Sequence, residues 1–201
     1  MLECVESEWD ILEPLVLHPN KHISSFAEQV LDLSQQAAGF HLLFVHTDAD
    51  APDEDEKAMP RKIRPAQQAL DRIEPVGGYC RFLVPVIPVV KIENWKLADS
   101  DALRGALGTL LPDETLGLNI GSKQLEEKNA SKELLSEVLQ RINDGRRVPV
   151  TLEDLDAALA KNISLKRMYR FKSFQKFVER LKAALVDQNI IKSDCSPKFI
   201  N

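Results

Sequence analysis

Two aspartates spaced i, i+2 directly follow a short apolar run, and this pattern carries the clearest chemistry in the chain. The run Leu42-Leu43-Phe44-Val45 leads into His46-Thr47-Asp48-Ala49-Asp50. Short apolar runs bounded by turn signals indicate buried strands of a parallel sheet, and ligands of such sheets bind beyond the carboxyl ends of the strands. Residues i and i+2 face the same way while the chain is extended. The pattern therefore predicts that Asp48 and Asp50 point two carboxylates into one small volume.

Two close carboxylates are stable only with a proton, a cation or open water between them. A hard divalent cation, Mg²⁺ or Mn²⁺, prefers oxygen ligands and would give the pair a chemical role. We therefore predict that Asp48 and Asp50 bind metal. His46 lies two residues before Asp48 and is a candidate partner on the same strand face, although a satisfied buried histidine is the alternative. The acidic residues 53–56 that follow are interpreted as a solvated loop.

A third carboxylate, Glu93, follows the second apolar region of the chain in the sequence Glu93-Asn94-Trp95. We interpret Glu93 as a catalytic or metal-orienting acid, with an ordinary loop residue as the alternative. Asp99 lies six residues further on, and it either joins such a site or caps the helix that follows. Trp95 belongs to the core or covers the site.

Basic residues are concentrated near the C-terminal end. Residues 161–182 contain eight Lys or Arg residues and one acid, Glu179, in a chain whose net charge is −5. Cationic side chains neutralise phosphates, and interleaved aromatic rings such as Tyr169 and Phe171 can stack on bases. The predicted nucleic-acid contacts are Lys166, Arg167, Arg170 and Lys172. A solvated basic helix surface is the alternative interpretation.

The composition is that of an ordinary globular protein, with 201 residues of which 44% are hydrophobic and 28% charged. The net negative charge argues against indiscriminate nucleic-acid binding by the whole surface. Cys4, Cys80 and Cys195 are few, odd in number and far apart, which predicts reduced thiols in the cytoplasm with no zinc or disulfide framework. We find no signal-peptide pattern and no apolar stretch of membrane-spanning length, so no membrane partner is expected.

Hydrophobic periodicity predicts an α/β protein with a helical C-terminal half. Helices are expected over residues 24–38, 65–73, 100–110, 131–142, 152–160 and 174–186, and strands over residues 41–46 and within 79–92. Pro85 and Pro88 make the second strand region an edge strand or two short pieces. Thr151 with Asp154 forms a capping box for one helix, and Ser173 is expected to cap the last. The division that follows is an α/β core over residues 1–110 and a helical region over 111–201 packed on it, as one structural domain.

Three passages in this order resemble the small, mostly uncharacterised bacterial proteins with a Toprim-like fold. These proteins are relatives of the topoisomerase–primase domain and of the overcoming-lysogenisation-defect nucleases, and many are suspected of phage defence. The passages are residues 42–50, residues 88–99 followed by Ala102-Leu103, and residues 171–177 followed by Leu181. The resemblance covers about residues 28–186, and it implies a Rossmann-like central, mostly parallel sheet flanked by helices.

The resemblance also implies an activity. In the Toprim-like fold a strand-end glutamate and an Asp-x-Asp pair bind Mg²⁺ and support cleavage or transfer at a phosphodiester. The pair maps onto Asp48 and Asp50, and Glu93 matches the glutamate of the family's Glu-x-Trp passage. Metal ions in such sites stabilise the attacking and leaving oxygens. The implied function is a metal-dependent nuclease or phosphodiester enzyme with nucleic acid as its substrate.

The start of the chain departs from the family. The family begins with a strand ending in a Val-Glu-Gly-x-x-Glu-like turn, which supplies the first catalytic glutamate, whereas residues 2–8 here have acids but no glycine turn. We therefore expect an N-terminally shortened form or a relative that has lost this element. The alternative function is a non-catalytic interaction module whose uncovered sheet edge binds a partner chain or the missing segment. Homo-oligomerisation stays open.

Two other enzyme classes use Asp-x-Asp. A phosphatase of the haloacid-dehalogenase type would have Thr or Val where this chain has Pro52, and nucleotide-sugar glycosyltransferases usually have a longer domain. The chain contains no P-loop, Gly-x-Ser-x-Gly or dinucleotide-binding fingerprint. These patterns leave the Toprim-like enzyme and the interaction module as the two leading hypotheses.

Overall fold

The computed structural model describes residues 16–49, 55–74, 78–128, 131–144 and 146–195 in two compact units. The first unit takes the chain up to Thr47, residues 55–87 and the chain from Lys176 to Ile200, and the second takes residues 48–54 and 88–175, with Asn201. The chain thus passes between the units several times, and the boundary does not coincide with the predicted division at residue 110.

The first unit contains a parallel pair of strands, β1 (Leu43–His46) and β2 (Leu83–Val86). Leu43 pairs with Leu83 and His46 with Val86, so the strands are in register from end to end. In the described part of the chain this two-stranded sheet is the whole sheet. The predicted α/β class is confirmed at this coarse level, and both strands fall within their predicted regions.

Pro85 shows why β2 is an edge strand. The amides of Leu43 on β1 and of Thr47, the residue after β1, donate to the carbonyls of Phe82 and Val86, at 2.9 and 3.1 Å. Successive residues of a strand direct their backbone N–H and C=O groups to opposite edges. The backbone groups of Leu83 and Pro85 therefore point away from β1. Proline has no N–H to contribute there. The edge-strand alternative is therefore confirmed, and Pro85 blunts the outer edge.

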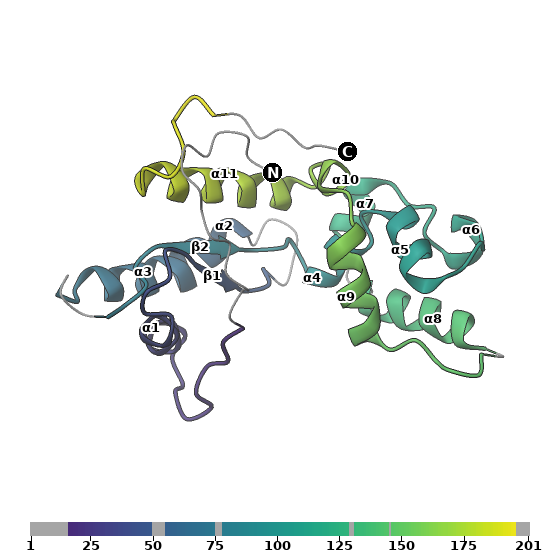
Figure 1. Cartoon of the computed structure of the whole chain (residues 1–201), viewed down its shortest axis with the longest axis horizontal. Helices are drawn as coiled ribbons and strands as arrows, with labels where there is room; N and C mark the ends of the chain where they lie inside the picture. Colours follow the sequence, from purple (N-terminus) through teal and green to yellow (C-terminus); the bar gives the residue numbers. More distant parts are fainter. Residues whose placement is uncertain (1–15, 50–54, 75–77, 129–130, 145, 196–201) are drawn as a thin grey trace. The chain divides into compact units, whose positions relative to one another are not determined.

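Helices pack around this strand pair. They are α1 (Phe26–Gln36), α2 (Asp55–Ala58), η1 (Met59–Ile63), α3 (Arg64–Asp71) and the second half of α11 (Lys172–Asp187). α1 packs against α3, and in Figure 1 it lies on the side of the strands opposite to α11. The ring of Phe44 on β1 packs against Phe177 of α11, with ring centroids 6.2 Å apart.

The chain is helical from Asp55 to Asp71, ten residues earlier than the predicted start at Pro65. Pro60 and Pro65 each lie in the first turn of a helical segment, η1 and α3, where a missing N–H is tolerated. The sequence predicted a single short helix over residues 65–73, with Pro65 in its first turn. The structure instead joins three short helical segments end to end.

The second unit is helical. Its elements are α4 (Ile92–Lys96), α5 (Ser100–Leu107), α6 (Asp113–Leu116), α7 (Ser122–Glu126), α8 (Ser131–Asn143), α9 (Leu152–Asn162) and α10 (Leu165–Met168), with the start of α11. The predicted capping box of Thr151 and Asp154 on α9 is confirmed. α5 ends at Gly108, whose φ of +58° is in the left-handed region that glycine adopts without strain. None of the helices in the described residues combines the length and apolar character needed to span a membrane.

Ser173 is not the cap of the last helix. α11 begins at Lys172, so Ser173 lies inside its first turn. The amides of Lys172 and Ser173 donate to the Glu126 carboxylate at 3.1 and 2.7 Å, and the Ser173 hydroxyl also donates to it at 2.6 Å. The acceptor for this helix start thus comes from α7, 46 residues away, which a local sequence pattern cannot reveal.

The two cysteines among the described residues, Cys80 and Cys195, differ in their chemical state. Cys80 is a buried free thiol, and burial raises the pKa of that thiol. Cys195 is disulfide-bonded, so the expectation that this residue is a reduced thiol is wrong.

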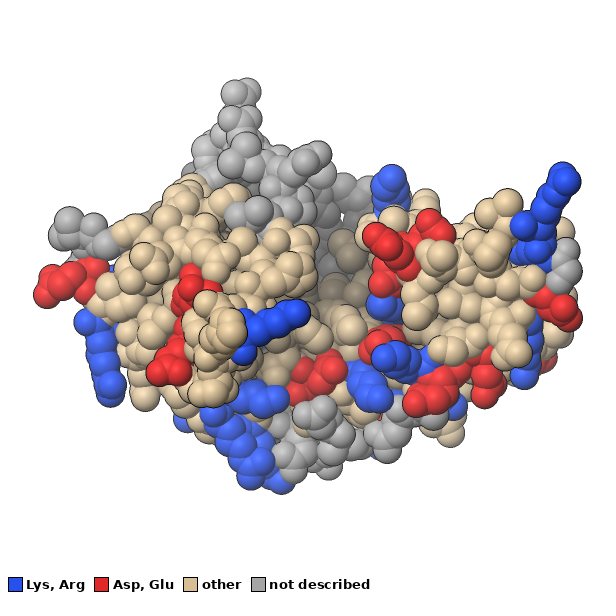
Figure 2. All heavy atoms as spheres, turned by 90° about the horizontal axis from the view of Figure 1, so that it is seen from below, with Lys and Arg blue, Asp and Glu red and all other residues tan. Residues whose placement is uncertain are grey.

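Figure 2 shows Lys and Arg side chains interspersed with Asp and Glu side chains over the face in view. Charges of a single sign therefore do not cover that face.

Candidate metal site and basic surface

The backbone stays extended beyond β1 and carries Asp48 to the carboxyl end of the strand pair. The Ala49 amide donates to the Pro88 carbonyl at 3.1 Å, continuing the ladder. Burial alternates along this stretch: Val45, Thr47 and Ala49 are buried, whereas His46 is exposed and Asp48 is half-buried. Asp48 therefore continues the outward-facing set of side chains to which His46 belongs, as the i, i+2 spacing predicted.

Thr47 fixes the end of β1. Its amide donates to the Val86 carbonyl at 3.1 Å, and its hydroxyl accepts a hydrogen bond from Lys62 Nζ of η1 at 2.8 Å. Lys62 was not predicted at this position, because the helical segment that brings it to Thr47 was not expected from the sequence. A cation at this place is suited to a site that handles negative charge.

Asp50, the second predicted metal ligand, lies outside the described residues. Among the residues that the structure describes, no three His, Cys, Asp or Glu side chains are grouped as a metal-binding cluster. Among the described residues, the carboxylates that follow the two strands along the chain are those of Asp48 and Glu93. Carboxylate oxygens are the ligands that Mg²⁺ and Mn²⁺ prefer, so the donor chemistry fits.

Glu93 lies in the first turn of α4, five residues after Pro88, whose carbonyl accepts the hydrogen bond from the Ala49 amide. Its side chain is half-buried and has no hydrogen-bond or ion-pair partner among the described residues. A carboxylate near a helix N-terminus is stabilised there and remains available to a ligand. The structure thus leaves Glu93 in a position compatible with its predicted role.

The neighbours of Glu93 hold α4 in place. Asn94 is buried, and its Nδ2 donates to the carbonyls of Leu125, Glu126 and Lys128 at 2.6, 2.9 and 3.0 Å, while its Oδ1 accepts from Ser131. Trp95 is also buried: its Nε1 donates to Ser173 Oγ at 2.9 Å, and its ring meets Phe174 edge-on. Trp95 is therefore a core residue.

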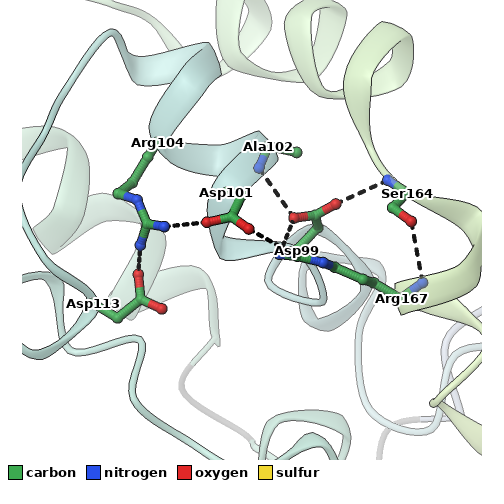
Figure 3. A network of polar contacts seen from close by, with 7 residues as sticks. All are labelled: Asp99, Asp101, Ala102, Arg104, Asp113, Ser164 and Arg167. Atoms are coloured by element: carbon green, nitrogen blue, oxygen red, sulfur yellow. Dashed lines mark hydrogen bonds and ion pairs between the residues drawn. The ribbon is translucent and has the colours of Figure 1, made fainter. Parts of the chain in front are cut away.

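Asp99 is a structural residue. Its carboxylate is buried and accepts hydrogen bonds from the amides of Ala102 and Ser164 at 3.1 and 2.9 Å. The first bond caps α5, which confirms the capping interpretation of Asp99. The second ties α5 to the start of α10 (Figure 3).

Arg167 closes this network. Its Nη1 lies 2.7 Å from Asp99 Oδ1, its Nη2 pairs with Asp101, and Arg104 pairs with both Asp101 and Asp113 (Figure 3). The hydrogen bond and charge of Arg167 lower the pKa of Asp101, and the Asp101 bond in turn raises the pKa of Arg167. Of the four predicted nucleic-acid contacts, Arg167 is thus already paired within the protein.

The other three predicted contacts, Lys166, Arg170 and Lys172, are exposed. No acidic residue occurs between Asp156 and Glu179, so this stretch is uniformly basic. Phe171 is only 1% exposed and belongs to the core, which rules out base stacking by this ring. The start of α11 is occupied by Glu126, so its amides are not free to bind a phosphate. Contacts here would come from side-chain cations.

Comparisons with known proteins identify no relative. No family model matches the chain, and neither a curated protein nor a solved structure matches it.

Proposed function

We propose that the protein is a metal-dependent enzyme acting on phosphodiester bonds of nucleic acid, with a Toprim-like site at the ends of its parallel strands and a role in prokaryotic phage defence. The observation that carries the proposal is topological. Asp48 and the helix bearing Glu93 follow the carboxyl ends of two adjacent, parallel, in-register strands. This is where open α/β sheets bind their ligands.

Asp48 and Asp50 would hold Mg²⁺ or Mn²⁺ in this site, and Glu93 would orient the metal or accept a proton from the attacking water. When bound, the metal supplies stabilisation of charge on the phosphoryl oxygens. This assignment fits the half-buried carboxylate of Glu93, which has no hydrogen-bond or ion-pair partner in the part of the chain that the structure describes.

Lys166, Arg170 and Lys172 would contact the phosphate backbone of the substrate. Because the core ring of Phe171 cannot stack, we expect weak preference among base sequences and a strong dependence on salt. Three phosphate contacts on a duplex predict a slope of about −2.7 in a plot of log affinity against log salt. Replacing Arg170 by Ala lowers the magnitude of that slope by about 0.9, whereas Arg167→Ala leaves it unchanged.

The activity is tested by incubating labelled single- and double-stranded DNA and RNA with the full chain, with Mg²⁺, Mn²⁺ or EDTA. We expect cleavage of at least one substrate with metal and none with EDTA. Asp48→Asn and Glu93→Gln should each reduce the rate by about 100-fold or more, the usual effect of removing a group that stabilises the transition state.

Glu137→Gln is the matched control, because Glu137 is an exposed carboxylate in α8 of the same unit. Its cleavage rate should equal that of the wild type. Cleavage that survives in both Asp48→Asn and Glu93→Gln would contradict the assignment of the site, and cleavage in EDTA would contradict the metal requirement.

The second candidate function is a non-catalytic module that binds a partner chain. It is favoured by Phe44 and Phe82, which are 51% and 38% exposed. Phe44 pairs with Val84, two residues after Phe82, so both rings project from the same face of the strand pair. Exposed aromatic rings are enriched in protein interfaces. Loss of partner binding in Phe82→Ser, with no cleavage by the wild type, would favour this function.

A further inference from the structure

A groove in the first unit is not used by the proposed function. It has a volume of about 520 Å³, within the range of small-molecule sites. Its walls come from η1 and α3, from β2 and the residues before it, and from the second half of α11. Leu83 and Pro85 of β2 line it, and their backbone groups point away from β1, so the groove follows the blunted outer edge of the strand.

The surface of the groove is mainly apolar with a cationic rim. Besides Leu83 and Pro85, Met59 and Ile63 contribute apolar side chains, and Ala183 of α11 contributes only a methyl group, which leaves room for a ligand. The charged groups that line the groove are Arg64, Arg81, Arg180, Asp71 and Asp187. The balance is positive, which favours an anion.

The guanidinium group of Arg81, which lines the groove, is held by some of its nitrogens and leaves others unpaired within the part of the chain that the structure describes. Its Nη2 donates to the carbonyls of Leu70 and Ile73 at the end of α3, which holds the guanidinium in place. Its Nε is buried and has no hydrogen-bond acceptor among the described residues. Buried donors are nearly always paired, because leaving one unpaired costs free energy. Because the buried Nε cannot be reached from the groove, a ligand oxygen would accept from Nη1, for which no hydrogen bond is found among the described residues.

Asp71 does not neutralise this end of the groove by pairing with Arg81. Its Oδ1 accepts a hydrogen bond from Gln67 Nε2 at 2.9 Å, and the same nitrogen lies 3.3 Å from the Arg81 carbonyl. Gln67 therefore connects the Asp71 carboxylate to the Arg81 backbone. An anion with an apolar body matches both the rim and the apolar wall.

We propose that this groove binds a small organic anion whose carboxylate or phosphate group accepts hydrogen bonds from Arg81 and Arg64. The apolar body of the ligand lies on Leu83, Pro85 and Ala183. The site is separate from the strand-end carboxylates and does not depend on their function.

The probe for this site is 8-anilinonaphthalene-1-sulfonate, an aromatic anion that fluoresces when it leaves water. Titration into the full chain should show saturable binding at one site. The uncharged analogue N-phenyl-1-naphthylamine should bind roughly tenfold more weakly, because it lacks the charged hydrogen-bond acceptor. Equal binding of the two probes, or no saturable binding of the anion, would overturn the proposal.

Three variants locate the site. Ala183→Leu fills the groove from an exposed position and should weaken binding of the anion by roughly tenfold. Arg81→Lys keeps the charge but removes the planar guanidinium with its Nη1 donors, and it should also weaken binding. Arg72→Ala is the control. Arg72 is an exposed residue at the C-terminal end of α3 and does not line the groove, so this variant should bind the anion as the wild type does. Unchanged binding in Ala183→Leu would place the probe elsewhere and refute the site.

Competition then distinguishes the two head groups. Nonanoate and octyl phosphate share an eight-carbon alkyl chain, and the one whose head group matches the site should displace the probe at lower concentration. Failure of both to displace it would refute the assigned ligand chemistry.

Discussion

The carboxylates of the second unit fall into two groups that differ in their surroundings. Asp99 and Glu126 are buried, and each accepts several hydrogen bonds from backbone amides and side chains. Glu93 is half-buried and has no such partner among the described residues. A carboxylate whose lone pairs are already occupied serves the fold, whereas one that is held in place but unoccupied can serve a ligand.

The same contrast separates the basic residues. Arg167 is paired with Asp99 and Asp101, whereas Lys166 and Arg170 are exposed. From the sequence alone, Lys166, Arg167 and Arg170 were all predicted to contact nucleic acid, because their residue type and spacing do not distinguish them. Only their tertiary contacts show that Arg167 holds α10 to α5 and that the others are available to a phosphate.

Asp99→Ala should give the largest effect on stability. The substitution removes the cap of α5, the bond to Ser164 and the partner of Arg167, so we expect a loss of about 3 kcal/mol in the free energy of unfolding. Urea denaturation followed by circular dichroism measures it. Asp156→Ala, which breaks the exposed pair with Lys96, should cost less than about 1 kcal/mol. An equal loss of unfolding free energy in the two variants would show that the hydrogen bonds and ion pair of Asp99 stabilise the fold no more than an exposed ion pair does.

Glu126→Ala should come next, at about 2 kcal/mol, because two amides at the start of α11 and the Ser173 hydroxyl lose their acceptor. In a Trp9→Phe background the emission of Trp95, which donates to Ser173, should also change. Glu126→Gln keeps an acceptor and should cost less than Glu126→Ala. An unaltered Trp95 emission in Glu126→Ala would contradict the hydrogen-bond chain from Trp95 through Ser173 to Glu126.

The smallest effect is a pH dependence that arises from Asp101. Arg167 lowers the pKa of Asp101 in the folded state, so the stabilisation is present above the ordinary aspartate pKa of about 3.9 and is lost as the pH falls through the lowered folded-state pKa. The pair is exposed, so the effect should stay below about 1 kcal/mol. The difference in unfolding free energy between wild type and Asp101→Asn should shrink from pH 6 to pH 2. If the difference in unfolding free energy between the two proteins grows as the pH falls, the stabilising role of the Asp101–Arg167 pair is contradicted.

Local patterns in the sequence predicted local features well. The capping box at Thr151, the cap at Asp99 and the edge-strand character of Pro85 all depend on neighbouring residues, and the structure confirms them. The same is true of the alternation that directs Asp48 outward.

Features that depend on distant contacts were not predictable. Glu126 caps a helix 46 residues away, Arg167 pairs with a residue 68 positions away, and Lys62 reaches Thr47 only because residues 55–71 form successive helical segments. The charged residues 53–56 were interpreted as a solvated loop, so the helix was predicted to begin only at Pro65. Pairing of this kind is set by tertiary packing, which periodicity does not encode.

The central claim is that the strand-end carboxylates bind a divalent metal, and calorimetric titration of Mn²⁺ into the full chain tests it most directly. We predict saturable binding to the wild type, loss of that binding in Asp48→Ala/Asp50→Ala, weaker binding in Glu93→Gln, and unchanged binding in Glu137→Gln. Absence of binding to the wild type, or equal binding to the double variant, would contradict the claim and leave the partner-binding module as the better account.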